Sequence, residues 1–226
     1  MIKQARNAFI LAAAVGAVGA SSVAVAEVTA NAAVTSNYVW RGLSQTDDGA
    51  ALQGGVDYAH ESGFYLGAWA SNFDYGEDAD SGIEYDLYAG FANEVGEFGY
   101  DVAYLTYNYT DSDLDTAKEI KLGVSYNVAS LNYYIGDSGA SDMNTYNYIE
   151  VGADFELPAE STLVLHYGMA SGDYVEASDP EGDKQQTDYS VGISKDFAGF
   201  NVGLSYADHS DDDGLFFATV SKEFEF

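Results

Sequence analysis

The feature that most constrains the fold is an alternation of period two that recurs along almost the whole chain. The segment "FNVGLSYA" shows it clearly, since Phe200, Val202 and Leu204 alternate with small or polar residues. Residues 82–91 ("GIEYDLYAGF") and 119–127 ("EIKLGVSYN") repeat the same pattern. Because successive side chains of a strand point to opposite faces, the pattern predicts β-strands with one apolar and one polar face.

Twelve such runs can be counted in the sequence. Most are about 9–12 residues long, which is longer than the roughly 5–6 residues usual in soluble sheets. A tilted strand crosses a bilayer with about 9–11 residues. The predicted strands are 28–41, 50–60, 63–72, 82–93, 97–109, 117–127, 129–136, 145–157, 161–170, 187–196, 199–207 and 215–226.

The connections between the runs alternate in length. Short ones such as "ESG", "NVAS", "PAE" and "DFAG" alternate with long acidic ones such as "FDYGEDADSG" and "SGDYVEASDPEGDKQQ". Short turns at one end and long polar loops at the other are typical of outer-membrane barrels. A soluble secreted β-barrel or sandwich explains the alternation but not this asymmetry. We therefore predict an all-β fold, a transmembrane antiparallel up-and-down β-barrel of about 12 strands, with 10 or 14 as alternatives.

The N-terminus has the layout of a secretory signal peptide. Lys3 and Arg6 precede the apolar run "AFILAAAVGAVGA", and a small-residue exit, "AVA", ends at Ala26. A membrane-anchoring helix would need about 20 apolar residues, and this run is shorter. We predict cleavage after Ala26, which leaves residues 27–226 as a single barrel domain in the outer membrane of a Gram-negative bacterium.

The charge of the chain narrows the possible partners. The formal net charge is −29, and removing the two basic residues of the signal peptide makes it −31. Nucleic acid is an unlikely partner, because phosphate binding requires Lys and Arg. Arg41 is the only arginine in residues 27–226, which raises the question of what it binds.

The polar faces of the runs carry many carboxylates. Desolvating each would cost several kcal/mol in a dry core, so the polar faces are expected to line a water-filled lumen and the apolar faces to contact lipid. Tyrosines such as Tyr104, Tyr107, Tyr109, Tyr133 and Tyr134 fit interfacial girdles. The predicted lumen or constriction residues are Arg41, Asp57, Glu84, Asp86, Asp101, Lys121, Glu150 and Asp154.

Along the first predicted strand, Tyr38 and Trp40 share the apolar face and are expected near the outer headgroups. Arg41 then points into the barrel mouth. A guanidinium can bridge two carboxylates in a bidentate manner, so Arg41 could hold an acidic loop in the lumen. Two alternatives remain open, namely direct contact with a permeating solute and contact with lipid headgroups.

The segment 36–72 carries a resemblance to a known family. Its motif "SNYVWRG" is followed by "SQT" and by the hairpin "GFYLGAWASN". In these motifs the chain resembles the TorF-like porins, small proteobacterial outer-membrane proteins. The later strands match in rhythm and length. The resemblance implies an outer-membrane location and a pore role, but names no solute.

The C-terminal strand, "GLFFATVSKEFEF", alternates to its last residue, Phe226. A terminal aromatic of this kind resembles the signal that the outer-membrane assembly machinery reads. We therefore expect this machinery to be a partner through Phe226, together with outer-membrane lipid and lipopolysaccharide.

The acidic connections raise the question of a metal site. The run "DSDLD" begins like an EF-hand loop, but Thr116 and Leu122 stand where glycine and the bidentate glutamate belong. Weak binding of Ca²⁺ or Mg²⁺ remains open beside a plain solvated surface, and no cofactor is predicted. The acidic residues expected in extracellular loops are Asp111, Asp113, Asp115, Asp211, Asp212 and Asp213.

These features predict a porin-like passive channel for small hydrophilic solutes, with a preference for cations. The alternative is a non-conducting structural or surface-interaction barrel, plugged by Tyr65, Trp69, Tyr88 and Tyr134 if these point inward. An enzyme is not expected. The one candidate cluster, His209 with Asp208 and Ser210, consists of neighbours on a loop, which is not a catalytic geometry.

Overall fold

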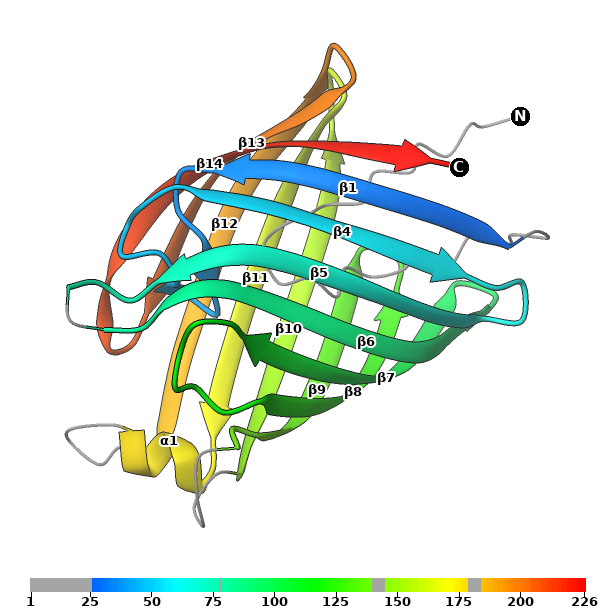
Figure 1. Cartoon of the computed structure of the whole chain (residues 1–226). Coiled ribbons are helices and arrows are strands. Elements are labelled where there is room, and N and C mark those ends of the chain that lie inside the picture. Colours follow the sequence, from blue (N-terminus) through cyan, green and yellow to red (C-terminus); the bar gives the residue numbers. More distant parts are fainter. Residues whose placement is uncertain (1–25, 78, 140–144, 179–183) are drawn as a thin grey trace.

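The computed structural model describes residues 26–77, 79–139, 145–178 and 184–226. Residues 1–25, which make up nearly all of the predicted signal peptide, lie outside this part. Twelve strands form one closed antiparallel barrel, in which each strand pairs with its sequence neighbours and β1 pairs with β14 (Figure 1). The predicted fold class is confirmed.

The strands follow the predicted runs closely. They are β1 (Glu27–Thr35), β4 (Ala51–Ala59), β5 (Phe64–Asp74), β6 (Ser81–Val95), β7 (Phe98–Tyr109), β8 (Ala117–Tyr126), β9 (Ala129–Asp137), β10 (Thr145–Leu157), β11 (Ser161–Ser171), β12 (Gln185–Phe197), β13 (Phe200–His209) and β14 (Asp212–Glu225). A short helix, α1 (Asp173–Ser178), follows β11. No helix in the described ranges is long and apolar enough to cross a membrane.

The two faces of the wall differ as the alternation predicts. Outward-pointing Leu52, Leu66 and Phe216 have exposed fractions of 68%, 56% and 73%. Inward-pointing Glu119 and Tyr148 are 1% exposed. The chain therefore presents apolar side chains to its surroundings and encloses polar and aromatic ones.

The first strand departs from the prediction. The expected run extended to residue 41, but β1 ends at Thr35, and residues 36–49 turn into the barrel, where β2 (Val39–Trp40) pairs with β3 (Leu43–Ser44). We call residues 36–49 the inner hairpin. Its base is held by hydrogen bonds from the Gln45 amide to the Tyr38 carbonyl (2.6 Å) and from the Tyr38 amide to Thr46 Oγ1 (3.0 Å).

The tip of the inner hairpin requires residues that tolerate a left-handed backbone. Arg41 has a φ of 48° and Gly42 a φ of 81°. A Cβ on Gly42 would lie 2.7 Å from the carbonyl oxygen of Asp208, so glycine lets the tip approach β13 closely.

The two ends of the barrel also differ. The tight turns, the start of β1 and the end of β14 lie at one end, and α1 and the longer connections lie at the other (Figure 1). Asp111, Asp113 and Asp115 lie exposed in the connection between β7 and β8. The last predicted loop is shorter than expected, because β14 already begins at Asp212. Asp211 therefore lies in the turn, and Asp212 and Asp213 lie in the strand.

Candidate functional site

The inner hairpin crosses the lumen and touches the wall on several sides. Val39 packs with Ala207 of β13 and Phe217 of β14. Tyr38 packs edge-on against Trp69 of β5, with ring centroids 5.4 Å apart. Trp40 contacts Tyr107 of β7 at 5.8 Å. The hairpin therefore narrows the lumen at this level.

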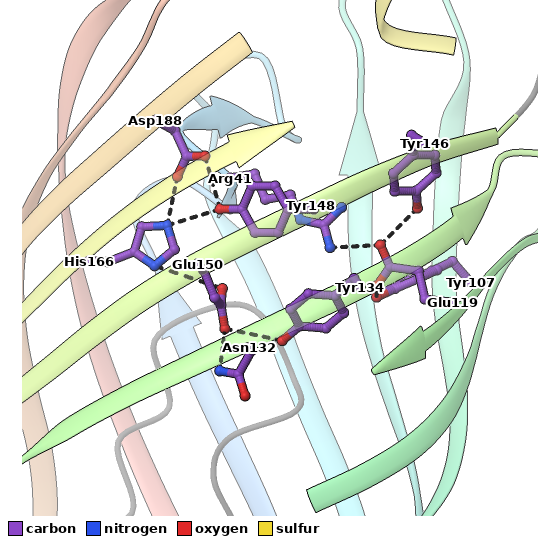
Figure 2. Close-up of polar contacts among 10 residues, drawn as sticks. All are labelled: Arg41, Tyr107, Glu119, Asn132, Tyr134, Tyr146, Tyr148, Glu150, His166 and Asp188. Atoms are coloured by element: carbon purple, nitrogen blue, oxygen red, sulfur yellow. Dashed lines mark hydrogen bonds and ion pairs between the residues drawn. The ribbon is translucent and has the colours of Figure 1, made fainter. Parts of the chain in front are cut away.

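Arg41, at the hairpin tip, forms an ion pair with Glu119 of β8. Arg41 Nη2 lies 2.6 Å from Glu119 Oε1, and the Glu119 side chain is fully shielded from solvent. The hydroxyls of Tyr107 and Tyr146 also donate to Glu119, at 2.7 and 2.8 Å (Figure 2). Both carboxylate oxygens are thus satisfied, and the pair ties the hairpin tip to the far wall.

Aromatic rings surround the same guanidinium. Its carbon lies 3.9 Å from the ring centroid of Tyr148 and 4.2 Å from that of Trp40, with Tyr134 and Tyr146 at 5.2 and 5.8 Å. Burial by itself would lower the pKa of Arg41, but the Glu119 carboxylate and the tyrosines Tyr146, Tyr107 and Tyr148 together outweigh it, and the pKa is raised well above its usual value. Arg41 therefore stays charged, and cation–π attraction adds about 2 kcal/mol where water is excluded.

A second cluster of polar side chains lies next to these aromatic rings, on β10, β11 and β12. The Tyr148 hydroxyl donates to Asp188 Oδ2 at 2.9 Å and lies 3.0 Å from His166 Nε2. His166 Nε2 lies 2.7 Å from Asp188 Oδ1, and His166 Nδ1 lies 3.8 Å from Glu150 Oε2. Glu150 also accepts hydrogen bonds from Asn132 and from the Tyr134 hydroxyl (Figure 2). The network cross-links neighbouring strands on the inner face.

A third cluster of polar side chains lies on the inner face of strands β4 to β8. Lys121 Nζ is 2.9 Å from Asp101 Oδ2, and the Tyr65 hydroxyl donates to Asp101 Oδ1 at 2.8 Å. The Tyr88 hydroxyl donates to Asp57. In this cluster Lys121, Tyr65 and Tyr88 provide the charge and the hydrogen bonds for the carboxylates of Asp101 and Asp57.

All eight predicted lumen residues lie inside the barrel. Seven of them occupy inward-facing positions on the strands. One of these seven, Asp154, lies at the exposed end of the barrel that carries the tight turns. Arg41 also lies inside, but on the inner hairpin, and its side-chain ion pair is with one carboxylate rather than two. Whether these residues contact a permeating solute stays a prediction.

Two placements of aromatic residues are wrong. Tyr38 and Trp40 do not lie at the lipid headgroups, since the strand that would carry them there ends at Thr35. Tyr107, Tyr109 and Tyr134, expected in the interfacial girdles, lie on the inner face, whereas Tyr104 and Tyr133 do point outward. Tyr65, Trp69, Tyr88 and Tyr134 all point inward, as the alternative of a plugged barrel requires.

The main partners of Arg41 could not be identified from the amino-acid sequence. These are Glu119, Tyr107, Tyr146 and Tyr148, together with the adjoining His166 and Asp188. The alternation contained a usable signal, because Tyr146 and Tyr148 are on the same strand face as Glu150. Counting tyrosine as a lipid-facing residue obscured it.

The suspected cluster at His209 does not assemble. His209 is buried on the inner face at 7% exposure, whereas Asp208 accepts a hydrogen bond from the outward-facing Tyr206. Within the described residues, no group of three or more His, Cys, Asp or Glu side chains is placed to hold a metal ion.

Known barrels share this architecture. The KdgM porin superposes with a TM-score of 0.61 at 9% identity, covering 87% of this chain and 99% of that one. The NanC porin gives a TM-score of 0.53 at 10% identity, covering 87% and 97%. At such identities the likeness shows a common porin-like barrel fold.

Sequence comparisons place the chain in a family. No curated protein matches it. The model of one family, described as "Bacterial protein of unknown function (Gcw_chp)", matches residues 17–225. The chain therefore belongs to the Gcw_chp family of bacterial proteins.

Proposed function

We propose that this protein is an outer-membrane channel for small hydrophilic solutes that prefers cations. The observation that carries the proposal is a closed barrel with an apolar outer face around a polar, charged inner face. Such a wall suits lipid outside and water inside. The porin-like fold supports the proposal, and the predicted signal peptide and the resemblance to TorF-like porins agree with it as predictions.

The cation preference rests on the charges inside. Carboxylates outnumber bases on the inner face of the described strands. The carboxylates inside the barrel include Asp57, Glu84, Asp86, Asp101, Glu119, Glu150, Asp154, Glu156 and Asp188, and the bases include Arg41, Lys121, His166 and His209. An excess of fixed negative charge in a narrow path raises the local concentration of cations and disfavours anions.

The neighbouring porin structures suggest a contrast in solute. One KdgM structure is described in complex with disordered oligogalacturonate, an acidic oligosaccharide, with a TM-score of 0.56 at 7% identity. The acidic lumen described above would repel such a polyanion. We therefore propose cationic or neutral small molecules rather than acidic oligosaccharides.

In this proposal Arg41 is an anchor. Its charge is already committed to Glu119 and the surrounding rings, so it holds the inner hairpin across the lumen and sets the width of the path. A second candidate is a non-conducting barrel with a structural or surface-interaction role. The inward position of Tyr65, Trp69, Tyr88 and Tyr134 favours it.

Planar-bilayer recording on the purified protein tests both candidates. Under a KCl gradient at low salt, the reversal potential should have the sign of a K⁺-preferring channel. A Cl⁻-preferring reversal potential would refute the cation preference. Absence of any conductance, together with liposomes that do not swell in small sugars, would refute the channel and support the plugged barrel.

A further inference from the structure

Two carboxylates of β6, Glu84 and Asp86, lie side by side on the inner face next to the inner hairpin. They are two residues apart and therefore share one face of the strand. Their exposed fractions are 4% and 5%. Asp86 lies opposite Trp69 on one side and Tyr107 on the other, so it is enclosed by the wall itself.

The hydrogen-bond donors around this pair are mostly committed elsewhere. The Tyr107 hydroxyl donates to Glu119 at 2.7 Å, and Ser71, opposite Glu84, donates to the Asn72 carbonyl at 2.9 Å. The Tyr38 side chain interacts with Glu84. Asp86 Oδ1 is buried and has no hydrogen-bond partner among the described residues.

The bases around the pair are also committed. Arg41 is paired with Glu119, and Lys121 is paired with Asp101 at 2.9 Å. In the described part of the chain, neither Glu84 nor Asp86 has an ion pair. Glu119 adds a further like charge that acts on Asp86. Because an uncompensated buried charge is strongly destabilising, the charge of this corner of the lumen must be balanced by a proton or by a bound cation.

We infer that Glu84 and Asp86 form a binding subsite for a monovalent inorganic cation of the K⁺ or Na⁺ type. Carboxylate and hydroxyl oxygens are the ligands that hard cations prefer. Ca²⁺ takes about 6–8 oxygen ligands, usually from several carboxylates, and Mg²⁺ keeps several of its own waters. Two carboxylates with exposed fractions of 4% and 5% suit neither ion. The inference deepens the proposed function, on which it rests, by naming the part of the wall that holds a cation.

Thallous ion, a probe for K⁺ sites, allows a direct binding test. The folded barrel in detergent is titrated with Tl⁺ in K⁺-free buffer at about pH 10, far above ordinary carboxyl pKa values, and the ²⁰⁵Tl line width is recorded. The wild type should show saturable broadening that K⁺ reverses. The E84Q/D86N variant should bind Tl⁺ about tenfold or more weakly, because both attracting charges are gone.

The matched control is E94Q/E97Q, which also removes two carboxylates, but from the exposed tight-turn end of β6 and from the turn that follows it. It should keep the broadening. Heat-modifiable migration on SDS gels checks that each variant is a folded barrel, and the single variant D86N replaces the double variant if the latter does not fold.

Three results would overturn the site: no saturable broadening in the wild type, equal broadening in E84Q/D86N, or equal loss in E94Q/E97Q. Infrared spectra of the same samples add a fourth. A protonated carboxyl band in the wild type that is missing from D86N would mean that a proton balances the charge. Tl⁺ binding without bilayer conductance would reject the channel but keep the subsite. Conductance without Tl⁺ binding would reject the subsite but keep the channel.

Discussion

Replacing Arg41 with methionine should release the inner hairpin from the barrel wall. Methionine keeps an unbranched apolar stem but removes the guanidinium, which leaves Glu119 charged and fully shielded from solvent. Breaking a buried ion pair by removing one partner costs about 3–5 kcal/mol. Since the Arg41 side chain is itself 14% exposed, we expect a loss near the lower end, about 3 kcal/mol in the free energy of unfolding.

A double-mutant cycle with Glu119→Gln isolates the pair. Glu119→Gln leaves Arg41 without its carboxylate, whereas R41M/E119Q leaves no buried charge at this point. The double variant should therefore lose less than the sum of the two single losses, by about 1–3 kcal/mol. Arg41→Lys keeps the charge but not the planar group that stacks on Tyr148, so its loss should be smaller than that of R41M.

The assay is urea unfolding of the purified barrel in lipid vesicles, followed by tryptophan fluorescence. Urea is used because guanidinium ions would compete with the Arg41 side chain for Glu119 and the surrounding aromatic rings. Additivity within about 0.5 kcal/mol would refute the reasoning that this pair anchors the hairpin. If the protein conducts, R41M should also have a larger single-channel conductance than the wild type.

Two further predictions concern the lipid face and the C-terminus. Leu204→Arg should lower the free energy of unfolding in vesicles by about 2–4 kcal/mol, because Leu204 points outward from the middle of β13 at 54% exposure, and an unchanged value would contradict a lipid-facing position. Deleting Phe226, which is 83% exposed, should slow barrel assembly in vesicles that contain the assembly machinery but not in plain vesicles. Equal rates in both would contradict a recognition role.

The strands could be predicted from sequence because their signal is local. The period of two and the alternating connection lengths depend only on neighbouring residues, and they gave the strand number and which face is polar. The inner hairpin could not be predicted in this way. Residues 36–41 continue the alternation of β1, and an aromatic such as Trp40 suits a lipid interface as well as a lumen.

The polar contacts inside the barrel depend on closure, which no local pattern encodes. Arg41 and Glu119 are 78 positions apart in the chain, and they meet only because the hairpin folds inward across the lumen. Alternation indicated that Glu84, Asp86 and Glu150 point inward. It gave no indication of which carboxylates find a base and which, like Asp86, do not.

The central claim is that the apolar side of each strand contacts lipid and the polar side encloses the lumen. The chain contains no cysteine, so single cysteines along β13 can carry spin labels in vesicles, and collisions with oxygen or with a water-soluble nickel complex report the surroundings of each. Labels at Val202 and Leu204 should favour oxygen, and those at Asn201 and Gly203 should favour nickel. The opposite phase, or four labels that all meet water, would contradict the account.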